Sequence, residues 1–339
     1  MKHGLKIIIF LMLLFFGAQI IGLYLLNLSI LSVQKNEQGL IEINYTEPPT
    51  GRPEIDKNSI QPFTYVFFMI ILGTLILLFI IKMRLFKIWK AWFFLAIMLS
   101  LFIVLSVIID KVILALMISF ILTFLKLYKP NIIIHNLTEL FIYSAITLIL
   151  VPIFNIQLAF LLLIAISIYD AIAVWKLKHM ITLAKAQAEQ KMFAGLLIPY
   201  NINEKNVEKV EKNKVINNNK NNPNQKIKKG KNIDIKLPKI EMKIPSGLSV
   251  ENTRTAILGG GDIAFPMIFS GTVMSWLIEN SFTKTQAFFY TLIVVLFSGI
   301  GLFTLFLKSE KDKFYPAMPF ISFGCFLGFG VLYLLIQFL

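Results

Sequence analysis

Residues Thr255–Pro266 read TAILGGGDIAFP, an apolar run that contains one carboxylate, Asp262. The run has the composition of a membrane-spanning helix, and an ionised Asp inside a bilayer costs about 2.5–3.5 kcal/mol on insertion scales. Pro266 has no N–H to bond the carbonyl of Asp262, so we expect the helix to be loosened at its acid. Acids at such depth usually serve a function, and the rest of the chain has to supply a partner for this one. Three consecutive glycines before the acid would let another backbone approach closely: Gly259, Gly260 and Gly261.

The composition of the 339-residue chain indicates a polytopic membrane protein. Hydrophobic residues make up 57% of it and the mean hydropathy is +0.74, far above the values of an ordinary soluble domain. The single cysteine excludes intramolecular disulfides and metal sites built from several cysteines. The 3 histidines lack the His-Glu-x-x-His spacing of zinc proteases, and we expect neither a metal nor a cofactor.

Nine apolar segments predict an all-α membrane protein with nine transmembrane helices. The fourth segment is short for a span, which needs about 20 residues. We interpret the first as a retained helix rather than a cleaved signal peptide, because it is long and lacks a small-residue cleavage pattern. The segments cover residues 5–33, 62–81, 91–109, 112–127, 131–151, 156–175, 255–279, 286–307 and 315–337.

Lysine and arginine residues follow the even-numbered spans, so the positive-inside rule predicts a cytoplasmic N-terminus and a large cytoplasmic loop between helices six and seven. We therefore divide the chain into residues 1–175 with helices one to six, the loop 176–254, and residues 255–339 with helices seven to nine. The loop holds 17 Lys and Arg against 7 Asp and Glu, and its Asn- and Lys-rich part is predicted to be disordered. A solvated basic loop then accounts for most of the net charge of +14. Binding to anionic lipids is the alternative, and nucleic acid is not an expected partner.

A second lone acid, Asp170, lies in the sixth predicted span. It precedes Lys176 by 6 residues, or about 9 Å of helix, and Asp262 follows Arg254 by 8 residues, or about 12 Å. Because consecutive spans run in opposite directions, both acids are predicted at similar depth near the inner face.

Two carboxylates at matched depth have a specific chemical capability. They cannot both ionise cheaply, so the pair would share a proton. The pair could then act as a general base towards water and as a general acid towards a leaving amine, which is the aspartic-protease solution to amide hydrolysis. The alternative is that each Asp only satisfies a buried polar contact or binds an ion.

A third feature is predicted at the same depth. Residues 315–319 read YPAMP and open the ninth span, where one proline is usual at a helix start. The second proline further restricts the backbone, which would suit holding the carboxyl pair or an extended substrate.

Three short motifs resemble those of the presenilin/signal-peptide-peptidase family of nine-span intramembrane aspartyl proteases. They are Tyr169-Asp170 in span six, Gly259-Gly260-Gly261-Asp262 in span seven and Pro316-Ala317-Met318 in span nine. The order of the motifs, the span numbers and the large loop all agree, and the resemblance implies that Asp170 and Asp262 are the catalytic pair. Met318 stands where the family usually has Leu, a swap that conserves volume. The residues expected to shape the active site are Tyr169, Gly259, Gly260, Gly261, Pro316, Ala317, Met318 and Pro319.

The resemblance also implies what the protein would act on and where. Transmembrane helices of other proteins would be the substrates, membrane lipids would surround the enzyme, and no obligate partner subunit is indicated. The predicted topology is that of presenilin rather than that of signal peptide peptidase, which is inverted. The Ile-, Lys- and Asn-rich usage favours an archaeal source, and hence a prokaryotic cell membrane.

Two other functions stay open at this point. An ion- or proton-coupled transporter would also carry buried acids, although the absence of an obvious inverted repeat counts against transport. A prepilin-type peptidase would share the Gly-x-Gly-Asp motif but would cut soluble leader extensions.

Two smaller features carry further expectations. His135 and Glu139 lie one helical turn apart in span five, and a mutual hydrogen bond is expected in preference to metal binding. The stretch Ile233–Ile244 alternates apolar and polar residues, which predicts a strand just before the Asp262 span. We predict that this strand pairs with an unwound substrate by strand addition, the alternative being a simple tether.

Overall fold

The computed structural model describes residues 5–36, 39–53, 55–129, 131–177, 194–201, 253–309 and 315–338. Within these ranges the chain forms nine α-helices and two antiparallel two-stranded sheets. Eight of these helices are long and apolar enough to cross a membrane, and the remaining one, α4, has 17 residues. The predicted fold class, a helical membrane protein with nine helices, is confirmed.

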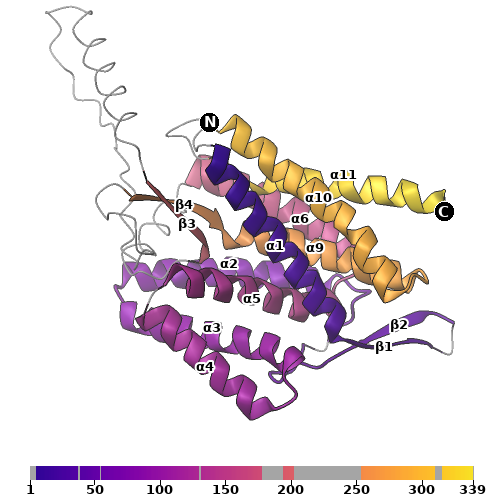
Figure 1. Cartoon of the computed structure of the whole chain (residues 1–339), viewed down its shortest axis with the longest axis horizontal. Coiled ribbons are helices and arrows are strands. Elements are labelled where there is room, and N and C mark those ends of the chain that lie inside the picture. The colour runs from indigo at the N-terminus through magenta and orange to yellow at the C-terminus, as the bar shows by residue number, and fades with distance from the viewer. Residues whose placement is uncertain are drawn as a thin grey trace, which may run out of the picture.

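The helices follow the predicted spans and differ mainly at their ends. In Figure 1 they lie side by side, with the N-terminus and the C-terminus at opposite ends of the bundle. A π-helical turn, Ala173–Leu177, extends α6. The bounds are α1 Leu5–Ser29, α2 Gln61–Lys82, α3 Phe86–Ile108, α4 Val112–Tyr128, α5 Ile132–Leu150, α6 Ile156–Ile172, α9 Gly260–Glu279, α10 Lys284–Lys308 and α11 Met318–Gln337.

The start of the seventh span differs from the expectation. The sequence predicts a helix from Thr255, whereas β4, Thr253–Gly259, is a strand and α9 begins only at Gly260. β4 pairs with β3, Gly195–Asn201, so both ends of the long loop contribute to one sheet. A short apolar run does not distinguish helix from strand, and here a partner segment far along the chain supplies the hydrogen bonds. The predicted strand Ile233–Ile244 lies outside the described residues.

A β-hairpin lies at the opposite end of the bundle from the β3–β4 sheet (Figure 1). α1 ends at Ser29 and continues directly into β1, Ile30–Lys35, which pairs with β2, Ile41–Tyr45. The first predicted span therefore ends earlier than residue 33, because its last residues join a strand ladder instead of the helix.

α9 is the central helix of the bundle. Of its membrane-spanning window 78% is buried inside the protein, compared with 11% for α2. It packs against α1, α5, α6, α10 and α11. Glycines allow this close packing: a Cβ on Gly22 of α1 would lie 2.1 Å from Met267 Sδ, and one on Gly271 would lie 2.7 Å from Val151 Cγ2. The helix that carries Asp262 is therefore enclosed by its neighbours.

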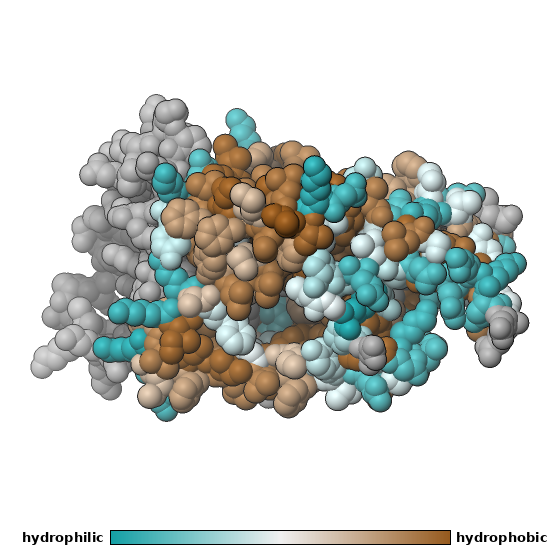
Figure 2. Space-filling view, turned by 90° about the horizontal axis from the view of Figure 1, so that it is seen from below, coloured by the Kyte–Doolittle hydropathy of each residue, from teal (hydrophilic) through white to brown (hydrophobic). Residues whose placement is uncertain are grey.

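The surface of the bundle is apolar where lipid would surround it. Figure 2 shows a broad hydrophobic band across the middle of one face and polar residues gathered towards one end. Large apolar side chains such as Phe68, Trp92 and Ile113 are exposed on α2, α3 and α4. An apolar surface of this extent suits contact with hydrocarbon, so the chain is an integral, multi-pass membrane protein.

Candidate active site

Asp262 lies in the first turn of α9, which is capped by Gly259. The depth expected from counting helical residues after Arg254 is therefore wrong, because residues 254–259 belong to strand β4. The first turn of a helix has backbone N–H groups without intrahelical partners, and the helix dipole favours negative charge there. The helix itself thus stabilises an ionised carboxylate at this position.

The backbone after Asp262 is also unusual. Pro266 lies inside α9, so the carbonyl of Asp262 lacks its usual helical partner. The next carbonyl, that of Ile263, accepts a hydrogen bond from Nε2 of the buried Gln19 at 2.9 Å. A side chain of α1 therefore binds the loosened turn of α9.

The three glycines before Asp262 meet different surroundings. A Cβ on Gly260 would lie 2.9 Å from Cε1 and 3.1 Å from the hydroxyl of Tyr143, so a side-chain ring occupies the space where a second backbone was expected. A Cβ on Gly259 would lie 3.0 Å from Oδ2 of Asp262 itself. A Cβ on Gly261 would be 3.5 Å from the ring of Phe265, which is an ordinary contact. Steric need for glycine is therefore strongest at Gly260.

Asp170 lies in the last turn of α6, and its side chain is buried against the start of α11. Its Oδ2 accepts a hydrogen bond of 3.1 Å from the backbone N–H of Met318, the first residue of α11. Pro316 and Pro319, which flank the Ala317-Met318 pair, have no N–H to offer. The Pro-Ala-Met motif thus presents a helix N-terminus to the Asp170 carboxylate.

Further contacts set the position of α6. Ser167, one turn before Asp170, donates a hydrogen bond of 2.8 Å to the hydroxyl of Ser322 on α11. The hydroxyl of Tyr169 lies 3.5 Å from that of Thr74 on α2. Tyr169 therefore connects α6 to α2.

The fold brings the two predicted acids together. α6 packs against α9, and Asp170 and Asp262 lie near enough for their charges to interact. Each carboxyl is associated with a helix N-terminus, Asp262 with its own helix and Asp170 with α11. Within the described ranges, no group of three or more His, Cys, Asp or Glu side chains could hold a metal ion. This arrangement can hold one shared proton and one negative charge between two carboxyls.

The β3–β4 sheet has one closed and one open edge beside this pair. Asn136 of α5 bonds both backbone groups of Leu197, with Nδ2 donating to its carbonyl and Oδ1 accepting from its N–H, each at 2.9 Å. Because Leu197 is paired with Ile257, the backbone groups of Ile257 must point away from β3, on the other side of the sheet. Pro199 has no N–H, so the outer edge of β3 lacks a donor there. Among the described residues no further strand pairs with the other edge of β4, which leads to Asp262.

His135 and Glu139 are both buried but do not have the partners expected from their spacing. His135 Nε2 lies 2.9 Å from the carbonyl oxygen of Gly195 in β3. Glu139 pairs through Oε1 with Lys126 of α4 and accepts through Oε2 from the hydroxyl of Tyr143, each at 2.5 Å. Lys126 and Tyr143 both contact Glu139, and Tyr143 also lies against Gly260 near the candidate site. The sequence pattern alone did not identify either residue. A lone lysine near the end of an apolar helix was the available signal, but it suits a membrane-interface anchor equally well.

Comparisons with known proteins agree on one family. Residues 40–338 match the family model described as signal-peptide peptidase, presenilin aspartyl protease. A solved structure of a presenilin family intramembrane aspartate protease in space group C222 has a TM-score of 0.53 and 16% identity, and the match covers 95% of this chain and 99% of that one. A second, in space group P2, has a TM-score of 0.52 and 17% identity and covers 96% of both chains. At this identity the structures show likeness of fold alone. No curated protein sequence matches the chain.

Proposed function

Because residues 40–338 match its model, the chain belongs to the signal-peptide peptidase and presenilin aspartyl protease family, and we propose that Asp170 and Asp262 are its catalytic pair. As a member of this family it is an intramembrane aspartic endopeptidase that hydrolyses peptide bonds in transmembrane segments. Family membership favours proteolysis over the ion-coupled transport and the prepilin-type cleavage that the sequence left open.

One observation carries the assignment of the pair: two carboxyls from neighbouring helices lie within electrostatic range, each at a helix N-terminus. In the proposed mechanism the ionised carboxylate takes a proton from a water molecule, and the resulting hydroxide adds to the scissile carbonyl carbon. The protonated carboxyl gives its proton to the carbonyl oxygen. When the C–N bond of the tetrahedral intermediate breaks, the carboxyl that took the water proton gives it to the leaving amine, and the other carboxylate takes back a hydroxyl proton of the intermediate. The two carboxyls thus carry out every proton transfer of the reaction.

The remaining motif residues would shape the site around this chemistry. Met318 would fix Asp170 through its backbone N–H, with Pro316 and Pro319 restricting the backbone on either side of Ala317. Gly260 would admit the ring of Tyr143, and Gly259 would leave room for the Asp262 carboxylate. Tyr169 would set the distance between α6 and α2, and Gly261 has the weakest steric argument of the group.

Asparagine variants test the pair directly. Asp170→Asn and Asp262→Asn keep the size of each side chain but cannot share or transfer the proton, so each should lower cleavage by roughly a thousandfold or more. The assay uses the full-length chain in liposomes with a synthetic single-span peptide, and cleavage products are followed by mass spectrometry. Cleavage at the wild-type rate in both variants would show that the pair is not catalytic.

A substrate helix has to unwind before its carbonyl can be attacked, and its freed backbone groups then need partners. We propose that the edge of β4 away from β3 supplies them around Ile257. The pairing predicted for Ile233–Ile244, which lies outside the described residues, stays a prediction. Ile257→Pro would remove a donor from this edge without touching the β3 pairing, and edge positions tolerate proline. It should slow cleavage about tenfold or more, whereas the control Ile257→Val should not. An unchanged rate in the folded Ile257→Pro protein would exclude pairing at this edge.

Orientation, source and partners complete the proposal. The N-terminus and the β3–β4 sheet lie at the same end of the bundle, and the basic residues favour the cytoplasm for that end (Figure 1). The enzyme would then work in the cell membrane of an archaeon on single helices of other membrane proteins. Labelling of cysteines introduced at the N-terminus and in the β1–β2 hairpin with a membrane-impermeant reagent distinguishes the two orientations.

A further inference from the structure

A line of buried polar side chains runs from α4 to α5 in the interior of the bundle. Lys126 Nζ lies 2.5 Å from Glu139 Oε1, and the two side chains are only 2% and 1% exposed. The other carboxylate oxygen of Glu139 accepts the hydroxyl of Tyr143, one turn further along α5. Both oxygens of the carboxylate are therefore used, each by a different kind of donor.

This line ends at the helix that carries Asp262. The ring and hydroxyl of Tyr143 lie against Gly260, where an added Cβ would meet Cε1 at 2.9 Å and the hydroxyl at 3.1 Å. Gly260 is the first residue of α9, two residues before Asp262. Tyr143 also lies within electrostatic range of Asp262. A displacement of the tyrosine ring would therefore move the first turn of α9.

Stability alone does not explain a buried ion pair with an attached tyrosine hydroxyl. Removing two charges from water is expensive, and well-packed apolar residues of similar volume often serve a fold equally well or better. A carboxylate with both oxygens occupied does hold its partners in one geometry, however. Here one partner is the hydroxyl of Tyr143, which lies against the first residue of α9. The benefit of the ion pair would then be that it fixes the position of Tyr143 relative to α9.

We propose that Tyr143, held by Glu139 and Lys126, is a positioning residue that fixes the first turn of α9 and thereby the Asp262 carboxylate. Lys126 balances the charge of Glu139, so that the side chain facing α9 is a neutral hydroxyl in a fixed place. The inference rests on the proposed function, because it assigns these residues a role through Asp262 rather than through contact with substrate.

Two variants distinguish a role in positioning α9 from a role in stability alone. Tyr143→Phe removes only the hydroxyl, and Lys126→Met with Glu139→Leu replaces the ion pair by apolar side chains while leaving the tyrosine. The second variant leaves no buried charge unpaired, so it should unfold at a higher temperature than Lys126→Met alone, although the Tyr143 hydroxyl loses its acceptor. Both should lower kcat about tenfold with little change in KM, since the substrate-binding edge is untouched. A purely structural network predicts instead that the folded double variant has the wild-type kcat.

A second tyrosine hydroxyl that contacts α9, that of Tyr45, supplies the control. Tyr45→Phe removes the hydroxyl that bonds Ser275, far from Asp262, and should leave kcat unchanged. All variants are assayed as full-length protein in liposomes with the same single-span peptide, and their thermal unfolding is measured in detergent. A wild-type kcat in either folded variant would overturn the positioning role. The asparagine variants of the acid pair, tested in parallel, would still decide the proposed function on their own.

Discussion

α9 is held near both ends by a tyrosine hydroxyl and a lysine–glutamate pair, and the two ends differ in burial. At its N-terminal end the ring of Tyr143 lies against the helix, and the Lys126–Glu139 side chains behind it are 2% and 1% exposed. At its C-terminal end Lys57 pairs with Glu279 at 2.6 Å, with side chains 40% and 34% exposed. The same pair of residue types, lysine and glutamate, is therefore buried in the protein interior at one end and partly exposed at the other.

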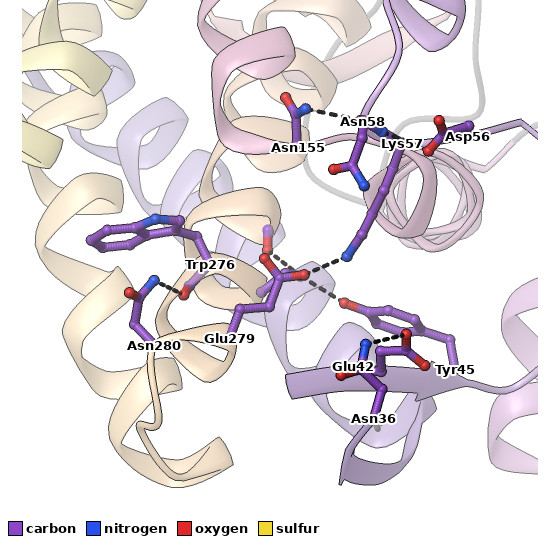
Figure 3. Close-up of polar contacts among 12 residues, drawn as sticks. Asn36, Glu42, Tyr45, Asp56, Lys57, Asn58, Asn155, Trp276, Glu279 and Asn280 are labelled. Carbon is purple, nitrogen blue, oxygen red and sulfur yellow. Dashed lines mark hydrogen bonds and ion pairs between the residues drawn. The ribbon is translucent and has the colours of Figure 1, made fainter. Parts of the chain in front are cut away.

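The C-terminal end is joined to two connecting segments, as Figure 3 shows. Tyr45 of β2 shares a hydrogen bond of 2.7 Å with Ser275, one turn before the end of α9. Asn155, the cap of α6, donates to the carbonyl of Lys57 at 2.9 Å. Tyr45, Lys57, Ser275 and Glu279 border a pocket of about 210 Å³.

The difference teaches what burial does to a charge pair. Water screens the exposed pair, so losing it leaves two solvated side chains and costs little. In the buried pair each charge balances the other, so losing one partner leaves an uncompensated charge in an apolar medium. The N-terminal end of α9 is thus rigidly specified, whereas the C-terminal end tolerates adjustment.

The largest effect is expected from removing one buried charge. Lys126→Met alone would leave the carboxylate of Glu139 without its cation, and the free energy of unfolding should fall by about 3–5 kcal/mol. Thermal unfolding of the purified protein in detergent measures this loss. A loss below about 1 kcal/mol would mean that the buried pair behaves like the exposed one, and the contrast between the two ends would disappear.

The next effect concerns the glycine that admits Tyr143. Gly260→Ala would place a methyl group 2.9 Å from Cε1 of the ring, and such overpacking should cost about 1–3 kcal/mol of stability. Gly261→Ala is the matched control, because its methyl group would meet Phe265 at 3.5 Å, and it should change stability by less than about 0.5 kcal/mol. Equal losses in the two variants would show that Tyr143 does not restrict this turn.

The sequence predicts the helices well and the strands poorly, for one physical reason. Lipid requires long apolar segments whose backbone is satisfied within each helix, and such segments are visible in the sequence. The ladder of β4 is instead completed by Gly195–Asn201, a segment more than 50 residues earlier. No local pattern in TAILG indicates that partner, and the depth assigned to Asp262 was therefore wrong.

The candidate site divides in the same way. Lone acids in apolar runs are visible in the sequence, which is why Asp170 and Asp262 could be predicted as a pair from it. The partners of Glu139 come from α4 and from the next turn of α5, whereas the spacing rule proposed His135. Spacing along one helix gives the possible neighbours on that helix, but tertiary packing decides which residue of another helix reaches the same carboxylate.

A smaller effect is expected at the C-terminal end of α9. Burial raises the pKa of the Tyr45 hydroxyl, so this phenol stays protonated in the folded protein when free tyrosine ionises. Tyr45→Phe should cost about 1 kcal/mol at pH 8, the usual value of a side-chain hydrogen bond. A raised pKa gives stability that is complete below the unfolded value of about 10 and is lost as the pH rises further. The difference in unfolding temperature between wild type and variant should therefore shrink above pH 10, and a constant difference would contradict this.

The smallest effect is expected from the exposed ion pair. Lys57→Met should lower the free energy of unfolding by about 0–1 kcal/mol, because both side chains retain contact with water when unpaired. Raising the salt from about 0.05 M to 0.5 M should remove most of this difference, since dissolved ions screen charges that are in contact with water. The same salt series should leave the much larger loss in Lys126→Met nearly unchanged, because salt does not enter the interior. Thermal unfolding of both variants across the series measures the two slopes side by side. A salt-independent loss in Lys57→Met above about 2 kcal/mol would show that Glu279 is as dependent on its lysine as Glu139, and that burial is not what distinguishes the two ends of α9.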